Sequence, residues 1–541
     1  MHPALAIPEI LGEIFLTHMA VQIPTETSFI TLNQGPEARW LFQKSPESGN
    51  LRALRRNLLN ASLTCRVFAA LALDGLWRYM DSIFPLLCCL SNFQFDTVSQ
   101  SYIISGEITS QDWMAFDNYA RRIHWISYCA GRDISQSVFE YLGQHRGSCI
   151  LPNLRVFQLQ DVPRPPRGAE IYLFAPPTLK IADIFQFHPI GHAAEQILHQ
   201  FLIQITKYCP GLRHLRVSAH LSEICLQYVS MLSDLRILEF GGRYGPSRLG
   251  DTSVTETNFL VTYTMNNLVL LCMDVHGDQF TVSPTVIQEL SRLESIELSG
   301  PISPIISILQ NLPKHRIHYI KLTLDPETDQ VIGGSSLHHS LFSELNFPAL
   351  RVLEVVSCYD DSEDAPILTR DILLTLLECN RLERVLINFD NISDVYTEDE
   401  DLRRMALAWP NLTRLEFGYC LYGRYPASPT VFALEHFARH CPRLIHVTIN
   451  ADTNVQIPDC PPAYSHGLRS VYLHSPRRRA GDKDNMQPLA RYLDSLFPRL
   501  KIPDRDMGER WNAIFECIAS SQAARRRDVL GDELVDSHSS S

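Results

Sequence analysis

The residues whose types and spacing could bind a metal ion lie close together near residue 440. His436 and His440 are four residues apart, so on a helix their imidazoles would face the same way, and Cys441 follows directly. Imidazole and thiolate are ligands that Zn²⁺ prefers, but a structural site needs four of them. No second pair completes this set, so we interpret these residues as part of a partly exposed helix and predict no metal site.

Sequence motifs of catalysis are missing. The sequence contains no G-x-x-x-x-G-K-[ST], H-E-x-x-H, G-x-S-x-G or G-x-G-x-x-G. The glycines Gly241, Gly242, Gly245 and Gly250 are better explained as turn residues of a loop. We therefore predict no catalytic residues and no cofactor. An enzyme with an unrecognised site ranks third among the functional hypotheses.

The cysteines and the apolar segments indicate an intracellular protein. The 14 cysteines in 541 residues stand singly in apolar stretches, apart from Cys88-Cys89, and none forms a C-x-x-C. The N-terminus has no basic region ahead of its apolar residues, and the run 83–90 is too short to span a bilayer. We expect reduced thiols, no membrane partner, and a cytoplasmic and/or nuclear location.

The charge balance argues against a nucleic-acid partner. Lys and Arg number 48 and Asp and Glu number 60, a formal net charge of −12. The acidic clusters at 360–364 and 398–401 are expected to be solvated loops. The arginine triplets at 477–479 and 525–527 are too short to indicate more than weak anion contacts.

A six-residue phrase recurs along most of the chain. It reads apolar, two variable, apolar, variable, apolar, and its copies start 23 to 33 residues apart, around the leucine-rich-repeat period. The twelve copies begin at Leu154, Leu179, Leu212, Leu235, Leu268, Leu293, Ile317, Leu350, Leu382, Leu412, Leu444 and Leu468. The copy at Leu179, LKIADI, is degraded.

Each copy is typical of a short parallel strand. Alternate apolar residues would point into a core, and in six copies a proline two residues ahead would end a preceding helix and start extended chain. Segments of helical period, such as the one from Ala193, precede many copies. This cycle predicts an α/β solenoid with a parallel sheet on its concave side and helices on its convex side.

In this register the variable places of the phrase face away from the core. They would form a mixed-charge surface that either binds a target or is merely solvated. The candidate target-binding residues are His214, Arg216, Glu239, Glu354, Arg384, Arg414, Glu416, His446 and Tyr472, and the same face would hold Gln158, Gln160, Glu297, Lys321, Asn450 and His474.

The N-terminal segment has a different pattern. Ile7, Ile10, Leu11, Ile14 and Phe15 have the spacing of an amphipathic helix. After a polar stretch, a dense apolar helical run starts at residue 58 and carries more hydrophobic surface than a small domain needs. Such a surplus usually marks a permanent partner.

Three sequence blocks resemble the F-box motif: Ile7-Pro8-Glu9-Ile10 with Ile14-Phe15, 59–66 (LNASLTCR) with Phe68, and Leu76-Trp77-Arg78. Thr64 stands where the motif usually has valine, and the loop after the first helix is about thirty residues longer than in the compact motif. The continuation into repeats is similar to the F-box/leucine-rich-repeat families of fungi.

The resemblance implies a substrate receptor of a Skp–cullin–F-box ubiquitin ligase. The F-box would bind the Skp-type adaptor, and through it a cullin, while the repeats would hold an unknown target protein for ubiquitination. The implied adaptor contacts are Ile7, Pro8, Ile10 and Ile14 from a first helix, Leu59, Leu63, Cys65 and Phe68 from a second, and Trp77 from a third. The alternative is a protein-interaction scaffold that assembles no ligase.

The expected domain organisation follows from these patterns. Residues 1–90 would form the F-box-like helical module with an internal loop at about 20–57, and 91–150 a linking and N-capping segment. Residues 151–503 would form the solenoid of about 11–12 repeats. We expect a C-terminal capping helix at 504–527 and a flexible tail at 528–541.

Overall fold

The computed structural model describes most of the chain, in two compact units. The described residues are 8–15, 21, 48–129, 133–147, 149–161, 169–184, 192–217, 223–240, 265–275, 290, 292–324, 334–357, 367–389, 395–419, 429–474, 486–503 and 509–538. Unit 1 comprises Met1–Asp274 with Thr285–Leu293, and unit 2 comprises Val275–Pro284 with Glu294–Ser541.

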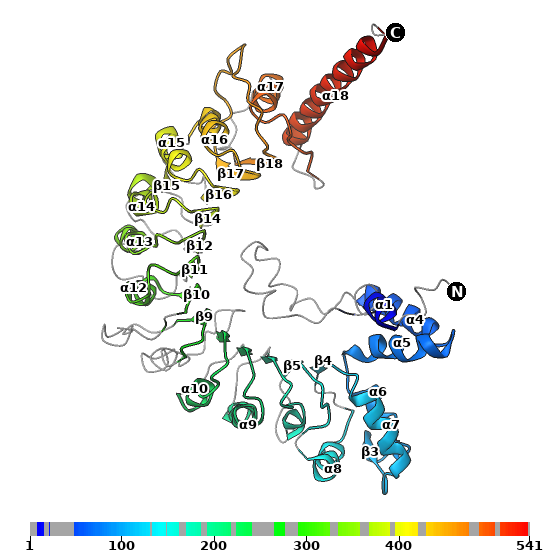
Figure 1. Ribbon diagram of the computed structural model, residues 1–541. Helices are drawn as coiled ribbons and strands as arrows, with labels where there is room; N and C mark the ends of the chain where they lie inside the picture. Colours follow the sequence, from blue (N-terminus) through cyan, green and yellow to red (C-terminus); the bar gives the residue numbers. More distant parts are fainter. Residues whose placement is uncertain are drawn as a thin grey trace. The chain divides into compact units, whose positions relative to one another are not determined.

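Unit 1 begins with helices and continues as alternating strands and helices (Figure 1). Its described helices are α1 (Pro8–Ile14), α4 (Ser48–Ser62), α5 (Arg66–Arg78), α6 (Phe84–Leu87), α7 (Ser110–Ala120), α8 (Gln136–Arg146), the 3-10 helix η3 (Ala169–Leu173), α9 (His192–Tyr208) and α10 (Glu223–Ser230). Its described strands are β1 (Tyr79–Met80), β2 (Phe93–Asp96), β3 (Ser101–Ile104), β4 (Trp125–Cys129), β5 (Val156–Asp161), β6 (Ile181–Ile184), β7 (His214–Val217), β8 (Ile237–Phe240) and β9 (Leu270–Asp274).

Unit 2 repeats the same alternation. Its described strands are β10 (Ser295–Gly300), β11 (Tyr319–Leu324), β12 (Val352–Ser357), β13 (Ile367–Leu368), β14 (Arg384–Phe389), β15 (Val395–Tyr396), β16 (Arg414–Tyr419), β17 (His446–Asn450) and β18 (Ser470–His474). Its described helices are α12 (Ile302–Gln310), α13 (Gly334–Ser343), α14 (Thr369–Leu376), α15 (Asp399–Ala408), η5 (Val431–Ala433), α16 (Leu434–His440), α17 (Met486–Leu496) and α18 (Glu509–His538).

The main strands of each unit pair in parallel and in chain order. In unit 1 the order is β1-β4-β5-β6-β7-β8-β9, and in unit 2 it is β10-β11-β12-β14-β16-β17-β18. All twelve copies of the sequence phrase form strands of these sheets, and helices cover one side of the strands in each unit (Figure 1). The predicted α/β solenoid is confirmed.

The phrase folds this way because its apolar places are buried between strand and helix. In the copy at Leu350, the first, fourth and sixth places are Leu350, Leu353 and Val355, all 0% exposed. The second residue of most copies continues the ladder: the amide of Arg351, for example, donates to the carbonyl of His318 at 2.8 Å. Each repeat therefore buries its apolar residues only when its neighbours are in place.

The cysteines that precede strands are structural. Cys209, Cys379 and Cys441 are 0% exposed, and each thiol donates to a backbone carbonyl of the preceding repeat. Burial raises the pKa of the Cys441 thiol to about 12. The predicted packing role of these cysteines is confirmed, and Cys441 is not placed to bind a metal with His436 and His440.

Sheet and cap extend beyond the predicted solenoid bounds. Strands β1 and β4 pair in the unit 1 sheet, so it begins ahead of residue 151, and an antiparallel hairpin, β2–β3, lies between them in sequence. At the other end, α18 runs over Glu509–His538, beyond the expected capping helix at 504–527 and through most of the expected tail. The cap is held by apolar residues of its first half, Ile514, Phe515 and Ile518, which are buried.

Candidate protein-binding surfaces

The three N-terminal helices α1, α4 and α5 pack into a small module with its own core. Phe15, Leu58 and Ala72 are buried together, and Phe68 packs on them with its ring 5.6 Å from that of Phe15. Helix α4 begins at Ser48, so the second helix starts earlier than the expected loop of 20–57 allows.

A set of apolar side chains from the same three helices faces outward. Ile10 and Ile14 of α1 are 42% and 37% exposed, although Leu11 and Phe15 beside them are buried. Leu59 of α4 is 48% exposed, and Leu63, which follows that helix, is 78% exposed. The spacing of four residues places Ile10 and Ile14 on one side of α1. We call Ile10, Ile14, Leu59 and Leu63, with Val67, the module face.

Val67 of α5 was missed by the sequence prediction and is 51% exposed. It occupies a variable place in the F-box-like blocks, so no motif marks it. The sequence feature that could have indicated Val67 is its position two residues after Cys65, in the first turn of an otherwise apolar helix.

The remaining predicted adaptor contacts lie elsewhere in the module. Cys65 is the N-cap residue of α5 and is partly exposed, while Phe68 belongs to α5 and packs on the core, rather than lying on the second helix. Trp77 lies in the last turn of α5 and stacks on Tyr119 of α7, with ring centroids 4.5 Å apart. Pro8 opens α1, and Ile7 lies outside the described residues.

The residues at the third and fifth places of the phrase form the sheet face. In unit 1 the third-place residues near the module and the fifth-place residues differ in polarity. Third-place residues near the module are apolar and buried: Val156 and Ile181 cluster with Trp125, Tyr79 and Leu51 of α4. This cluster attaches the module to the first strands. This part of the face is therefore packed against the module and is not open for a target.

Fifth-place residues of unit 1 form a buried charged cluster. Asp183, Arg216 and Glu239 are register partners on β6, β7 and β8, and Arg216 lies 3.5 Å from Asp183 and 3.8 Å from Glu239. His214 Nε2 lies 3.0 Å from Glu239 Oε1. Burial raises the pKa of Asp183 to about 6 against the opposing effect of Arg216.

Asp183 was not among the predicted target-binding residues. It lies in the degraded copy at Leu179, where it occupies the fifth place. The predicted residues His214, Arg216 and Glu239 are brought together with it, and the first two are at most 8% exposed.

A second charged cluster lies on β10, β11, β12 and β14 of unit 2. The Tyr319 hydroxyl donates to Glu297 at 2.9 Å, and Glu354 lies 3.8 Å from Lys321 and 3.7 Å from Arg384. The predicted residues Glu354 and Arg384 are therefore neighbours. Tyr319 was missed, although it occupies the third place of its copy.

The most open part of the sheet face lies on β16, β17 and β18. Arg414 Nε donates to Glu416 at 2.6 Å, and His446 Nε2 lies 3.3 Å from the same carboxylate. The hydrogen bond with His446, with the charge of Arg414, lowers the pKa of Glu416 to about 2. Tyr472 contacts His474 edge to face at 4.4 Å. These predicted residues form one continuous polar and aromatic surface.

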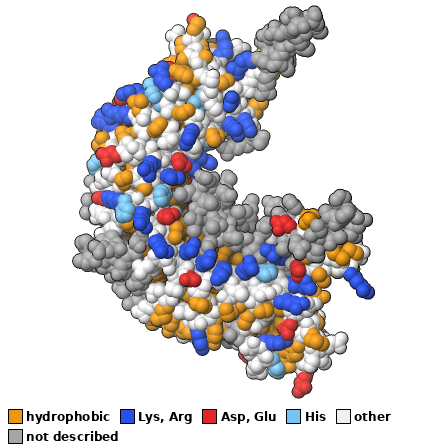
Figure 2. Space-filling view, viewed as in Figure 1, with side chains coloured by type: hydrophobic (Ala, Val, Ile, Leu, Met, Phe, Trp, Pro, Cys, Tyr) orange, Lys and Arg blue, Asp and Glu red, His pale blue; other side chains and the backbone are white. Residues whose placement is uncertain are grey.

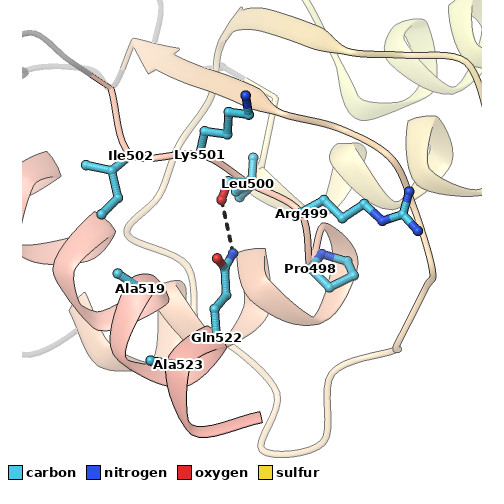
Figure 3. A pocket seen from close by; sticks show the side chains of 8 residues that line it. All are labelled: Pro498, Arg499, Leu500, Lys501, Ile502, Ala519, Gln522 and Ala523. Atoms are coloured by element: carbon cyan, nitrogen blue, oxygen red, sulfur yellow. Dashed lines mark hydrogen bonds between the residues drawn. The ribbon is translucent and has the colours of Figure 1, made fainter. Parts of the chain in front are cut away.

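A hollow of about 580 Å³ lies between the segment 498–502 and α18 (Figure 3). Gln522 crosses it and donates to the carbonyl of Leu500 at 3.1 Å. It is lined by Pro498, Arg499, Leu500, Lys501, Ile502, Ala519, Gln522 and Ala523. The lining contains no carboxylate, imidazole or thiol and so offers no general acid–base pair.

The described part of the chain lacks two further features. There, no group of three His, Cys, Asp or Glu residues is arranged to hold a metal ion. No helix within those residues has the length and apolar character needed to cross a bilayer.

The chain matches no protein-family model, and no curated protein matches it. Many solved structures resemble part of it, and two examples follow. An internalin (inlF) from Listeria monocytogenes is 12% identical, with a TM-score of 0.29 over 60% of this chain and 83% of that one. The complex of Rad7 and Elc1 in yeast is 15% identical, with a TM-score of 0.32 over 62% and 86%. Both likenesses are too distant to inform function, so the functional argument depends on the surfaces above.

Proposed function

We propose that this chain is a substrate-recognition adaptor of a Skp–cullin–F-box ubiquitin ligase. The module face would bind a Skp-type adaptor, and the sheet face of the solenoid would bind the target protein. The observation that carries the proposal is the module face itself, since Ile10, Ile14, Leu59 and Leu63 are exposed apolar residues at places where the F-box resemblance puts adaptor contacts.

The physical reason is that these side chains do not contribute to the module's own core. Leu58 and Phe15 already form that core and are at most 4% exposed. Leaving large apolar side chains in water is unfavourable, and each leucine buried by a partner contributes about 1.5–3 kcal/mol. The chain would add no chemistry of its own, and its contribution would be to hold a target lysine near a ubiquitin-charged enzyme.

The target surface is best assigned to β16, β17 and β18. Arg414 and His446 have exposed side-chain fractions of 47% and 27%, whereas His214 in unit 1 is 2% exposed. Side chains that combine exposure with fixed ion pairs can discriminate between partners through their charge pattern.

The test is co-purification of the full chain with a Skp-type adaptor. Leu59→Ser combined with Leu63→Ser should weaken adaptor binding by more than about tenfold, because two leucines lose their burial in the complex. The matched control is Leu374→Ser with Leu407→Ser, which changes two leucines of similar exposure on α14 and α15. We expect the control to bind the adaptor normally and both variants to keep the wild-type unfolding temperature.

A wild-type chain that is monodisperse alone and does not bind the adaptor would contradict the proposal. Equal losses in the two double variants would contradict it too, since they would show a general effect of surface serines. The scaffold alternative predicts stable partners whose abundance does not rise when the proteasome is inhibited.

A further inference from the structure

Basic residues line the edge of the unit 1 sheet where its strands begin. Arg155, Lys180, Arg213 and Arg236 fill the second place of four consecutive phrases. Their backbones are adjacent: the amides of Lys180, Arg213 and Arg236 donate to the carbonyls of Arg155, Lys180 and Arg213 at 2.9, 2.9 and 2.8 Å.

The same ladder continues upstream into the helical module. The amide of Arg155 donates to the carbonyl of His124 at 2.8 Å, and the amide of His124 donates to that of Arg78 at 3.1 Å. We call these six residues the basic row: Arg78, His124, Arg155, Lys180, Arg213 and Arg236. In Figure 2, Lys and Arg side chains follow one another over the strands of unit 1.

Acidic residues are nearly missing from this edge. The four residues that lead into each of the strands β4 to β8 are 121–124, 152–155, 177–180, 210–213 and 233–236, and Asp234 is the one acidic residue among them. Asp74, near the upstream end, is ion-paired with Arg122. The row therefore concentrates positive charge on a chain whose formal net charge is −12.

The side chains at the upstream end have unused capacity to bind an anion. The side chain of Arg155 is exposed and makes no hydrogen bond or ion pair with the described residues. Arg78 Nε is buried without a hydrogen-bond acceptor among them, so Arg78 contributes positive charge there rather than an accessible donor. Lys180 Nζ donates to the carbonyl of Gly211 at 3.1 Å and keeps two further donors.

Neighbouring charges in the row also repel one another. Burial, and then the charge of Arg155, lower the pKa of Arg78. Burial followed by the charges of Arg78 and Arg155 lowers the pKa of His124. An anion that bound along the row would remove this repulsion, whereas a neutral partner would not.

We propose that the basic row binds an extended acidic segment of a partner protein. Parallel strands are about 4.8 Å apart and an extended peptide advances about 3.3 Å per residue, so a segment crossing the strands meets a Lys or Arg every one to two residues, except at His124, whose lowered pKa keeps it neutral near pH 7. The six positions span about 24 Å, which seven or eight extended residues would cover.

An acidic peptide fits the row better than a nucleic acid does. Single-stranded nucleic acids are usually held by aromatic side chains interleaved with the cations, and the five strand entries contain no aromatic residue. The basic row is a different surface from the one on β16, β17 and β18, so the inference goes beyond the proposed function and depends on it only in assigning the acidic segment to the captured protein.

The test is fluorescence anisotropy of the full chain with a labelled dodecamer of alternating glutamate and serine. We expect binding that weakens between about 50 and 300 mM NaCl, because salt screens the charges. Arg155→Gln with Lys180→Gln should reduce the affinity roughly three- to tenfold. The control, Arg403→Gln with Arg404→Gln on the exposed surface of α15, loses the same charge and should bind as wild type does.

Four results would overturn the inference: no binding by the wild type, equal losses in the two double variants, equal binding of the dodecamer with glutamine in place of glutamate, or tighter binding of an oligothymidylate of the same length. The peptide is measured without a Skp-type adaptor, so failure of adaptor binding alone would count against the proposed function only. The Arg155→Gln, Lys180→Gln variant should still bind the adaptor.

Discussion

Two carboxylates on the sheet face have opposite energetic roles. Asp183 is 1% exposed, and the nearest donors, on Gln158 and Arg216, are both 3.5 Å away, so burial dominates and raises its pKa. Glu416 is partly exposed and has close contacts with Arg414 and His446, so its pKa is lowered. The same residue class therefore destabilises one repeat and stabilises another.

This difference predicts opposite effects of neutral substitutions. The pKa of Asp183 rises from 3.8 to about 6 on folding, so burying its ionised form lowers the folding stability by at most about 3 kcal/mol. This loss of stability is absent below pH 3.8, grows between pH 3.8 and 6, and is complete above pH 6. Asp183→Asn should therefore raise the unfolding temperature at pH 8 by several degrees and have less effect at pH 4.5. Differential scanning fluorimetry at both values measures this.

Glu416→Gln is the matched counterpart. The pKa of Glu416 falls from 4.5 to about 2 on folding, so its stabilisation is present above pH 4.5 and is lost as the pH falls towards 2. The substitution should lower the unfolding temperature at pH 8.

If Asp183→Asn destabilises the protein more at pH 8 than at pH 4.5, the ion pair of Asp183 with Arg216 outweighs the effect of burial and our account of Asp183 is wrong.

At the scale of single elements, α18 closes the last repeats of unit 2. Ile514, Phe515 and Ile518 are at most 2% exposed, Gln522 bonds to Leu500, and Arg525 lies 2.5 Å from Asp494 of α17. Beyond Arg525 the helix continues to His538. The first half of the helix carries contacts that seal the core.

Two truncations of the chain test the contributions of the two halves of α18 to stability. Ending the chain after residue 508 should expose Leu489, Leu493 and Leu496 of α17 and lower the unfolding temperature, or give insoluble protein, because a solenoid needs a closed end. Ending it after residue 527 should leave the unfolding temperature within about 2 °C of wild type. Equal destabilisation by the two truncations would show that the second half contributes to the cap.

The sequence predicted the repeated strands well because alternating apolar residues are a direct consequence of strand burial. Strand β4 has the same spacing in IHWISY from Ile123, with Tyr128 in the last apolar place, but it falls in the stretch expected to link the domains. Strand β1 has two residues and is too short for any pattern. The hairpin β2–β3 turns through Gln100 at a φ of +50°, without the glycine or asparagine that usually marks such turns.

The sites were less predictable, since exposure depends on packing between elements. The sequence could not show that Phe68 would pack on Phe15 while Leu63 stayed exposed, because both are apolar residues of one short segment. The length of α18 was underestimated for a related reason. Apolar periodicity reports the buried side of a helix, and residues 528–538 include only two leucines and one glutamate as strong helix formers, beside Gly531, three aspartates and Ser537, which disfavour helix.

At the scale of the whole molecule, the cysteines divide by burial. Among the described ones, Cys88 and Cys460 are exposed, and Cys209, Cys225, Cys272, Cys379 and Cys441 are buried. Burial raises the pKa of Cys209 and Cys441 to about 12, so these thiols form almost no thiolate near neutral pH.

Brief alkylation with iodoacetamide at pH 8, read by peptide mass spectrometry, should therefore modify Cys460 and Cys88 in the folded protein. Cys88 should react more slowly than an ordinary exposed thiol, because burial raises its pKa. The five buried cysteines should react only after denaturation. Their rapid modification under native conditions would mean that the repeats open on the timescale of the reaction.

The order of the strands has a consequence for how the chain acquires its structure. Within each unit, each main strand pairs with the main strand that comes before it in the sequence. The partner of each new repeat has therefore already been synthesised when that repeat leaves the ribosome. Residues that contact each other across neighbouring repeats are separated by only a short stretch of sequence, and this favours fast folding by propagation. Each unit can thus assemble vectorially during translation, and a pause after any complete repeat would leave a growing edge rather than a misfolded intermediate.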